Sequence, residues 1–475
     1  MSDNKRYNIA ITGTFDVENY GDLLFPVIFE KAMKKRGLKF RLFLFSPSET
    51  ANKALDDSAV VYSYSEFEKM HKKYHFDALV VGGGAIIHFN NIRIKLPGTK
   101  VFSDYRNTDS WYTLMYLAAK NNIKILFNVP QVPFVFTESV APLAKSVFMA
   151  TEYLSVRDDF SKEYMEALFA SDEVVKIRVF PDSVCSISQY YDKDSLRKSA
   201  KRLLGFDDKY MVVHFSRVMP EEAEPCLVEL IHKIEKKKYK VVFLPLGYTH
   251  GDDVAMVKFK EKYDLNDCFV FNKKLSIDDM TAVLAGCECY IGTSFHGSIV
   301  SVGFGNKAIS FNYYEPTLKN VDNYRRFGIS KYLASNYKML NPIFDELDKN
   351  KKAYRPKLKE IIKLVEEHFD AIFQYIVEER NEKCNNYDCV REALLGLISV
   401  ASQRDAEMDA MQNSLDGLRN ENGSLVNRLD EKTKECDRLI RELDECRKSY
   451  DLVINSKSWK ITKPIRKLKR MGGIK

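Results

Sequence analysis

The feature that most constrains the fold is a repeated alternation between short apolar runs and helical segments over the first 335 residues. The first group of apolar runs lies at 8–12, 39–45, 78–81, 124–129, 153–156 and 179–180. A polar, helical stretch follows at 182–208, and the rhythm then restarts at 210–215, 240–245, 268–271, 289–292 and 307–311. Such alternation is typical of parallel sheets covered by helices. The sequence therefore predicts two α/β halves, at 1–190 and 205–335, with a cleft where their strand ends face each other.

After residue 340 the sequence becomes helical and charged, and we expect 340–402 to pack back on the two halves. From 405 to 455 the period changes to a heptad. Position a is occupied by Met408, Leu415, Asn422, Leu429, Cys436, Leu443 and Tyr450, and position d by Met411, Leu418, Leu425, Lys432, Leu439, Cys446 and Val453. A seam with so few polar residues predicts a C-terminal α-helical coiled coil.

The polar residue Asn422 lies at one of the a positions. Two asparagines pair across the seam of a parallel dimer and penalise other registers and stoichiometries. We therefore expect a parallel homodimer through 405–455. A lone amphipathic helix packed on the body and a heteromeric partner with a matching seam are the alternatives.

The last segment, 456–475, mixes basic residues with Trp459 and several aliphatic side chains. At an anionic bilayer surface each such cation contributes about 1 kcal/mol, and tryptophan prefers the interface. The Ser-x-Ser-Trp-Lys-Ile-Thr-x-Pro-Ile-Arg pattern at 456–466 and the preceding coiled coil are similar to those of some bacterial polysaccharide glycosyltransferases. We expect this tail either to make peripheral contact with the inner face of a membrane or to be a basic end that aids solubility.

Outside this tail, the numbers of basic and acidic residues are balanced. The net charge is +7, but residues 457–475 contain eight Lys or Arg and no acid, whereas the preceding residues contain 65 basic and 66 acidic ones. A neutral body lacks the electrostatic footprint of a nucleic-acid-binding protein, so we expect no nucleic-acid partner.

Localisation and metal content follow from what the sequence lacks. It shows neither a signal-type start nor an apolar stretch of about 18 residues, which predicts a cytoplasmic protein. The nine cysteines are scattered without the spacing of zinc hooks. They predict reduced packing thiols and no metal site.

Two glycine-rich turns follow strands of the first half. The turn at 13–22 contains Asn-Tyr-Gly-Asp ahead of a helix, and residues 82–84 are three consecutive glycines. Glycines let backbone amides approach a ligand, and a helix N-terminus attracts anions. Neither turn has GxGxxG or GxxxxGK[ST] spacing, which disfavours nicotinamide and P-loop chemistry.

A third turn, Thr-Ser-Phe-His-Gly-Ser at 293–298, joins a strand to a helix and carries His296. A histidine at a helix start beside glycine is well placed to meet an anion or to donate a proton. A structural role is the alternative for a lone histidine.

Taken in order, these segments resemble the polysaccharide pyruvyltransferase family over residues 8–335. The resemblance rests on Asn-x-Gly-Asp, the triple glycine, Ser-Val-Arg-Asp at 155–158, Pro-Asp at 181–182 and Ser-Phe-His-Gly at 294–297. It implies two Rossmann-like halves resembling the GT-B arrangement. It also implies transfer of pyruvate from phosphoenolpyruvate to sugar hydroxyls as a ketal, in cell-surface polysaccharide biosynthesis, with no cofactor.

The resemblance also implies site residues. His296 matches the family's functional histidine and is the expected general acid, whereas Ser294 stands where several members have arginine. Arg157 and Arg217 are the candidate replacements for that cation. The expected substrate-binding residues are Asn19, Gly21, Asp22, Gly82, Gly83, Gly84, Arg157, Arg217, Ser294, Gly297 and Ser298.

The sequence leaves the acceptor and the overall function open. The expected acceptor is a glycan or lipid-linked sugar. His250, Asp252 and Asp253 either touch an acceptor sugar or a nucleotide or, as we expect, lie in a solvated loop. A GT-B-type glycosyltransferase using a nucleotide sugar and a non-catalytic coiled-coil scaffold are the alternative functions.

Overall fold

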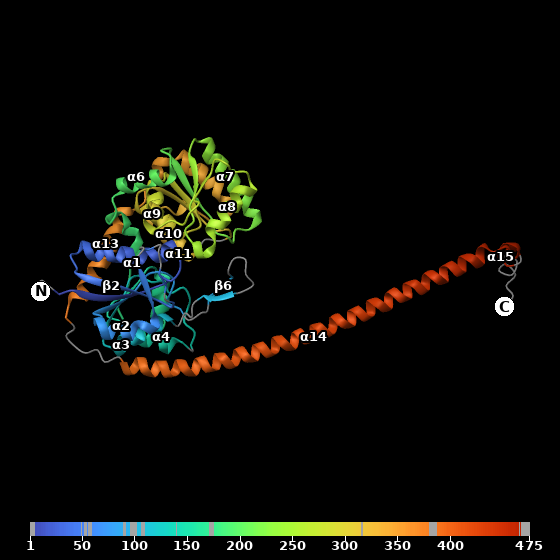
Figure 1. Ribbon diagram of the computed structural model, residues 1–475, viewed down its shortest axis with the longest axis horizontal. Coiled ribbons are helices and arrows are strands. Elements are labelled where there is room, and N and C mark those ends of the chain that lie inside the picture. The colour runs from blue at the N-terminus through green and yellow to red at the C-terminus, as the bar shows by residue number, and fades with distance from the viewer. Residues whose placement is uncertain are drawn as a thin grey trace. The chain divides into compact units, whose positions relative to one another are not determined.

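The computed structural model divides into two units, Met1–Leu397 and Ile398–Lys475 (Figure 1). It describes residues 5–48, 50–51, 55, 59–88, 92–95, 102–105, 110–138, 140–170, 175–314, 317–379, 387–464 and 466. Side chains are described for these residues except 51, 92–95, 102–105, 110, 387–390 and 392–409.

The first half contains a six-stranded sheet in the order β3-β4-β2-β1-β5-β8. Its strands are β1 (Tyr7–Thr12), β2 (Phe40–Ser46), β3 (Thr50–Ala51), β4 (Val60–Ser63), β5 (Ala78–Val81) and β8 (Lys124–Phe127). All neighbours pair in parallel except β3 and β4. The helices are α1 (Tyr20–Lys35), α2 (Phe67–Tyr74), α3 (Ser110–Lys120) and α4 (Ala141–Met149). Strands that are buried on both faces, such as β5, appear in the sequence as uninterrupted apolar runs.

A hairpin and a small β-α-β unit complete this half. A hairpin is formed by β6 (Ile92–Lys95) and β7 (Phe102–Tyr105). Strands β9 (Leu154–Val156) and β10 (Ile177–Val179) pair in parallel around α5 (Asp159–Glu166), and a bridge from Tyr153 to Leu126 places β9 beside β8.

The second half contains a fully parallel sheet in the order β13-β12-β11-β14-β15-β16. Its strands are β11 (Tyr210–His214), β12 (Lys240–Phe243), β13 (Phe269–Val270), β14 (Cys289–Gly292), β15 (Lys307–Phe311) and β16 (Leu333–Ala334). The helices are α6 (Lys193–Leu204), α7 (Glu224–Lys236), α8 (Asp252–Lys262), α9 (Ile277–Gly286), α10 (Phe295–Gly303) and α11 (Leu318–Phe327). Both halves therefore have the doubly wound order in which the first and fourth parallel strands are neighbours.

Sequence signals at helix ends explain where several of these helices begin and stop. Ser276 and Asp279 form a capping box at the start of α9. Asp192 caps α6, and Gly205 ends that helix in the left-handed conformation that glycine adopts without strain.

Two helices that follow residue 340 pack on both halves. Helix α12 (Leu340–Lys349) contacts α7 and β15, whereas α13 (Leu358–Val377) contacts α1 and β8. His368 of α13 is fully buried, and its ring bonds Tyr153 Oη at 2.9 Å and Asn128 Oδ1 at 3.0 Å.

The two halves are joined by a backbone clasp close to the start of α1. Asn19 forms an antiparallel bridge with Gly247, and Tyr20 N donates to Leu246 O at 2.8 Å. Tyr248 N in turn donates to Glu18 O at 3.0 Å. The turn at 13–22 is thus held directly against the second half.

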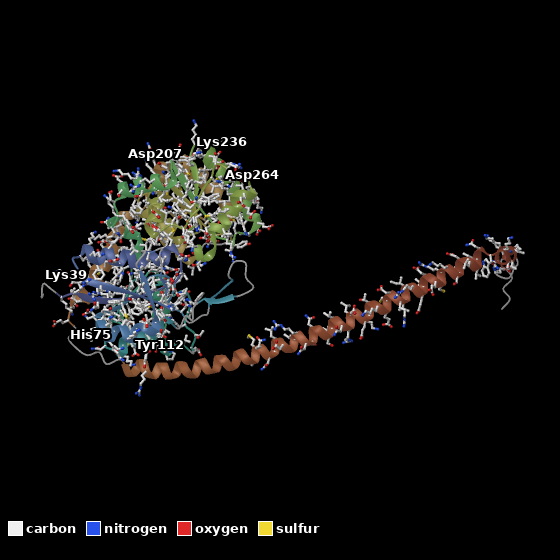
Figure 2. All side chains as sticks on the ribbon, in the orientation of Figure 1. Lys39, His75, Tyr112, Asp207, Lys236 and Asp264 are labelled. Atoms are coloured by element: carbon white, nitrogen blue, oxygen red, sulfur yellow. The ribbon has the colours of Figure 1, made fainter. Side chains whose placement is uncertain are left out.

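The remaining helices are α14 (Tyr387–Asn455) and α15 (Lys457–Ile461). The boundary expected at 402–405 falls inside α14, which is one continuous helix. Every side chain described from 410 to 453 is exposed, and Figure 2 shows them standing out from the helix. The side chain of Met408 and residues 465 and 467–475 of the predicted tail lie outside the described residues. Among the described residues, each helix is too short or too polar to cross a bilayer.

Candidate active site

His296 lies in the first turn of α10, directly after the C-terminal end of β14. The turn before it is fixed by two neighbours. Ser294 Oγ accepts a hydrogen bond from Gly297 N at 3.3 Å and so caps the helix. Tyr290 Oη accepts from Ser294 N at 3.0 Å and donates to Ser294 O at 3.2 Å. These hydrogen bonds therefore fix the turn that carries His296.

The glycine turns of the first half pack against this histidine. A Cβ on Gly21 would overlap Nδ1 of His296, so only glycine permits the approach. The ring of Phe25 meets the imidazole edge-on with centroids 5.4 Å apart, and a Cβ on Gly83 would overlap that phenyl ring. Two of the three predicted turns therefore meet the third at His296.

The other ring nitrogen faces a carboxylate. His296 Nε2 lies 3.7 Å from Asp182 Oδ2, which is ion-pair range but longer than a hydrogen bond. Nε2 is buried and has no hydrogen-bond partner among the described residues. Burial raises the pKa of Asp182, but His296 and then Arg157 lower it by more, so that the net pKa lies below its usual value. The Asp182 carboxyl thus stays ionised beside the imidazole.

Arg157 is buried on the other side of this carboxylate. Its Nη1 lies 3.4 Å from Asp182 Oδ2, its Nη2 donates to Gln131 Oε1, and its guanidinium lies 5.2 Å from the ring centroid of Phe295. Its Nε is buried and has no hydrogen-bond partner among the described residues, although Asp158 Oδ2 is 3.9 Å away. Arg157 and His296 therefore each keep one buried donor unused beside Asp182.

A pocket opens next to these side chains, with about 250 Å³ of free space including open solvent. It is lined by Arg157, Asp158, Pro181, Asp182, Phe295, Lys319, Asp322, Asn323 and Arg326. Lys319 is half-buried, and its Nζ lies 5.6 Å from the ring centroid of Phe295. Burial and then the charge of Arg157 lower the pKa of Lys319 to about 8, against the opposing effect of Asp22 and Asp182.

Lys319 and Arg326 are candidate site residues that sequence reasoning missed. Both lie on α11, which follows β15, and β15 pairs with β14 just before His296. Arg326 is already engaged, since its Nε bonds Asp322 Oδ2 at 2.6 Å. The available sequence signal was the position of α11 directly after a buried strand of the second half.

The structure brings the remaining residues of the first turn close to the triple glycine. Asn19 caps α1 by accepting from Gly21 N at 3.1 Å. Gly84 has a φ of +95°, which glycine tolerates, and a Cβ there would lie 3.3 Å from Asp22 Oδ1. A Cβ on Gly82 would lie 2.7 Å from Thr12 O. Asp22 and Gly84 are thus neighbours, next to Gly21 and Gly83, which pack against His296 and Phe25.

Three predicted residues have other surroundings. Arg217 is half-buried in the loop after β11 and does not line the pocket of Arg157 and Lys319. Ser298 is buried, and its Oγ bonds Tyr324 Oη at 2.7 Å, so it faces the core and not the pocket. A Cβ on Gly297 would lie 2.6 Å from the Tyr290 ring, which makes this glycine a close-packing position.

A second polar cluster lies at the end of β11. His214 is buried, and its Nε2 bonds Asp252 Oδ2 at 3.1 Å while its Nδ1 contacts Thr293 Oγ1 at 3.2 Å. Asp252 is also buried, and its Oδ1 has no hydrogen-bond partner among the described residues. The expectation of a solvated loop at 250–253 is therefore wrong for Asp252. His250 contacts the first half through Asn19, with 3.4 Å between the two side-chain nitrogens.

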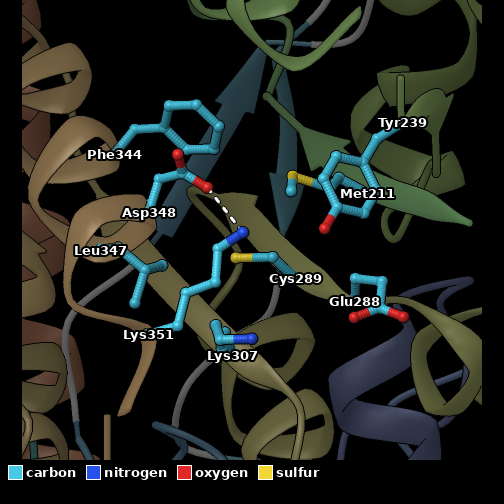
Figure 3. A pocket seen from close by; sticks show the side chains of 9 residues that line it. All are labelled: Met211, Tyr239, Glu288, Cys289, Lys307, Phe344, Leu347, Asp348 and Lys351. Carbon is cyan, nitrogen blue, oxygen red and sulfur yellow. Dashed lines mark ion pairs between the residues drawn. The ribbon is translucent and has the colours of Figure 1, made fainter. Parts of the chain in front are cut away.

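A further pocket lies at the opposite edge of the second sheet, where the strands begin (Figure 3). It is lined by Met211, Tyr239, Glu288, Cys289, Lys307, Phe344, Leu347, Asp348 and Lys351. Lys351 and Asp348 pair at 2.8 Å and so satisfy each other's charge. Ligands of open α/β sheets bind at the carboxyl ends of strands, which favours the His296 edge. Among the described residues no group of three potential metal ligands comes together.

Comparison with known proteins gives one family and a fold. A model of the polysaccharide pyruvyl transferase family matches residues 19–315, which is more than half of the chain. The UDP-GlcNAc 2-epimerase of Methanocaldococcus jannaschii aligns with a TM-score of 0.52 at 12% identity, covering 78% of this chain and 100% of that one. The UDP-GlcNAc 2-epimerase of Neisseria meningitidis bound to UDP-GlcNAc aligns with a TM-score of 0.51 at 8% identity, covering 79% and 100%. No curated protein sequence matches the chain.

Identities this low show the fold alone. The two structural alignments extend over both halves and confirm the prediction of Rossmann-like halves in a GT-B arrangement. The matched range 19–315 contains both halves of the candidate site, from the glycine turns to His296. The chain belongs to the polysaccharide pyruvyl transferase family.

Proposed function

We propose that this transferase moves pyruvate from phosphoenolpyruvate to two hydroxyls of a sugar, as a ketal, in the synthesis of a cell-surface polysaccharide. The observation that carries the proposal is a pair of buried donors without a partner among the described residues, His296 Nε2 and Arg157 Nε, next to a pocket whose lining includes both cations and aspartates. Buried donors are nearly always paired, so two unpaired donors beside such a pocket indicate a place for an anionic ligand. The family membership of the chain supports the same chemistry.

Phosphoenolpyruvate carries a phosphate and a carboxylate, and both require directional donors. Arg157 offers a planar guanidinium and Lys319 offers a compact charge, and both lie near the Phe295 ring. Ser294, which stands where several family members have arginine, caps α10 here. We assign to Lys319 the charge that Ser294 does not provide.

The acidic residues of the pocket have a separate role in this proposal. Asp322 is neutralised by Arg325 and Arg326 at 2.6 Å each, and Asp158 caps α5 by accepting from Ser161 N at 2.8 Å. Asp182 faces His296, and a carboxylate at that place stabilises the imidazolium. The protonated histidine then adds the positive charge that a multiply charged donor needs.

The reaction follows from this arrangement. His296 donates a proton to the methylene carbon of phosphoenolpyruvate, which leaves an oxocarbenium-like carbon at C2. A sugar hydroxyl attacks C2 and forms the first C–O bond. A second hydroxyl then attacks the same carbon, the C–O bond to phosphate breaks, and the ketal closes. Of the two hydroxyl protons, one returns to His296 and one leaves with inorganic phosphate.

The acceptor in this proposal is a glycan or lipid-linked sugar that enters between the carboxyl ends of the two sheets. Residues 18–20 and 246–250 form one border of that space. A nucleotide sugar is the rival donor, because the N. meningitidis neighbour was solved with UDP-GlcNAc.

Isothermal titration with phosphoenolpyruvate, together with a phosphate-release assay on candidate acceptors, tests the proposal. We expect the wild type to bind phosphoenolpyruvate and Lys319→Gln to bind it at least tenfold more weakly. Lys331→Gln, an exposed lysine after α11, is the matched control and should bind normally. Binding of UDP-GlcNAc without any binding of phosphoenolpyruvate would contradict the proposal.

The described part of the tail contains a short capped helix and a stacked Arg–Trp pair. Ser456 caps α15 by accepting from Trp459 N at 3.1 Å, and the guanidinium of Arg466 lies 3.5 Å from the centroid of a Trp459 ring. We propose that 456–475 holds this cytoplasmic enzyme at the inner face of the membrane, where lipid-linked acceptors are found. Co-sedimentation with anionic liposomes should be strong for the full chain and weak for a 1–455 truncation, and equal sedimentation of the two would contradict tail anchoring.

A further inference from the structure

Helix α14 carries an apolar stripe along its a and d positions. From Met411 to Val453 these side chains are exposed, for example Leu418 at 65% and Leu443 at 56%. A helix with an apolar seam and a charged remainder is stable in water only when the seam is buried. The stripe therefore requires a partner surface.

The composition of α14 makes that requirement stronger. Gly417 and Gly423 lie inside the helix, at outer positions c and b of the heptad, with no atom within 4 Å of a Cβ built on either. Each interior glycine costs about 1 kcal/mol relative to alanine. No packing of these glycines offsets that cost, so the stability must come from the seam.

We propose that α14 pairs with the α14 of a second copy of this chain, parallel and in register. Asn422 then meets the partner's Asn422, whereas full-overlap antiparallel pairing would place it against an apolar d residue, Leu439. Lys432, the other polar seam residue, turns aside to Glu435 at 2.5 Å on its own helix.

The charges that flank the seam agree with the parallel arrangement. Glu442 at position g faces position e of the partner helix, where this sequence has Arg447. The full-overlap antiparallel arrangement would bring Glu442 against Glu421 in each of two symmetric places. It would also bring Arg428 against Glu435, so that repulsion there offsets attraction. Opposite charges across the seam stabilise the pairing, and like charges oppose it.

Two cysteines in the seam can be used to determine the register of the two paired helices. Cys436 at position a and Cys446 at position d are free and exposed. In a parallel, in-register pair each lies opposite its own counterpart. In the full-overlap antiparallel pair they would lie opposite Leu425 and Leu415, far from any thiol of α14. Links between identical cysteines therefore define the arrangement.

Light scattering of the full-length protein and of two aspartate variants tests the surface. We expect the wild type to be a dimer. In Leu443→Asp, which introduces a charge at the seam, the dimer affinity should be at least 100-fold weaker. Leu452→Asp is the matched control, because Leu452 is 75% exposed and lies at outer position c. A monomeric wild type, or a Leu443→Asp variant that dimerises as tightly as Leu452→Asp, would overturn the proposal.

Treatment of the full-length dimer with a short bis-maleimide tests the register. Peptide mapping should find Cys436 linked to Cys436 and Cys446 linked to Cys446, and the Cys436→Ser variant should lose only the first link. Cys436–Cys446 links, or a dimer in which neither cysteine is linked, would exclude the parallel in-register arrangement.

Discussion

The two halves have the same order of parallel strands but contribute different chemistry at equivalent places. In the first half, β1 and β5 end in glycine-rich turns, and the absence of a Cβ there lets the backbone pack closely at the site. In the second half, the equivalent strands β11 and β14 end in His214 and in the turn that carries His296. The first half thus fits closely around His296, which the second half supports and which we propose as the proton donor.

The largest expected effect comes from removing that proton donor. His296→Asn keeps the size and polarity of the side chain but cannot supply the proton, so kcat should fall by about 10²- to 10⁴-fold. Phosphoenolpyruvate turnover measured by phosphate release checks this, and the melting temperature should change little. Full turnover in the variant would show that the second half does not provide the acid.

The next largest effect tests the contribution of the first half. Gly21→Ala introduces a Cβ that overlaps Nδ1 of His296, so the histidine or the 13–22 turn has to shift. A displacement of about 1 Å in a catalytic group lowers kcat by about 100-fold. Gly417→Ala, a glycine with open space around it, is the control and should keep full activity. A wild-type kcat in Gly21→Ala would show that the close fit of the first half around His296 does not affect catalysis.

Much of this arrangement could be predicted from the sequence. The apolar runs at 78–81 and 289–292 give β5 and β14, because buried parallel strands are uninterrupted apolar segments. Strand β16 was missed, since two residues are too few to form a pattern. The glycine turns and His296 were found because their residue types are unusual at the ends of strands.

The rest of the site depends on which strands are neighbours, and the strand order cannot be deduced from short segments of the sequence. Lys319 reaches the pocket because β15 lies beside β14, and a lysine on a helix has no local signal of its own. Asp252 is buried because β12 lies beside β11 and brings it to His214. Ser298 faces inward because a helix turns it away from the side on which His296 lies.

A smaller effect should appear in the pH dependence of donor binding. With a pKa of about 8, Lys319 is charged below that pH and loses its charge above it. The affinity for phosphoenolpyruvate should therefore fall as pH rises through 8, by up to tenfold per pH unit. Lys319→Arg stays charged and should bind with a flatter profile between pH 7 and 9. Identical titration profiles for both proteins would mean that the second half binds the donor without this charge.

The smallest expected effect concerns stability. It involves His368 of α13, a helix that packs against β8 of the first half. Burial, followed by the charges of Arg36 and Arg178, lowers the pKa of His368 to about 3. The unfolded chain binds a proton near pH 6.5 and the folded one does not, so the stability that His368 contributes is present above pH 6.5 and is lost as pH falls from 6.5 towards 3. The limiting slope is about 1.4 kcal/mol per pH unit. Urea unfolding at pH 7 and pH 5 should show a loss of about 2 kcal/mol, which a His368→Gln variant, although less stable at pH 7, should not show. Equal losses in both proteins would mean that α13 holds its histidine in some form other than the neutral one that bonds Tyr153 and Asn128.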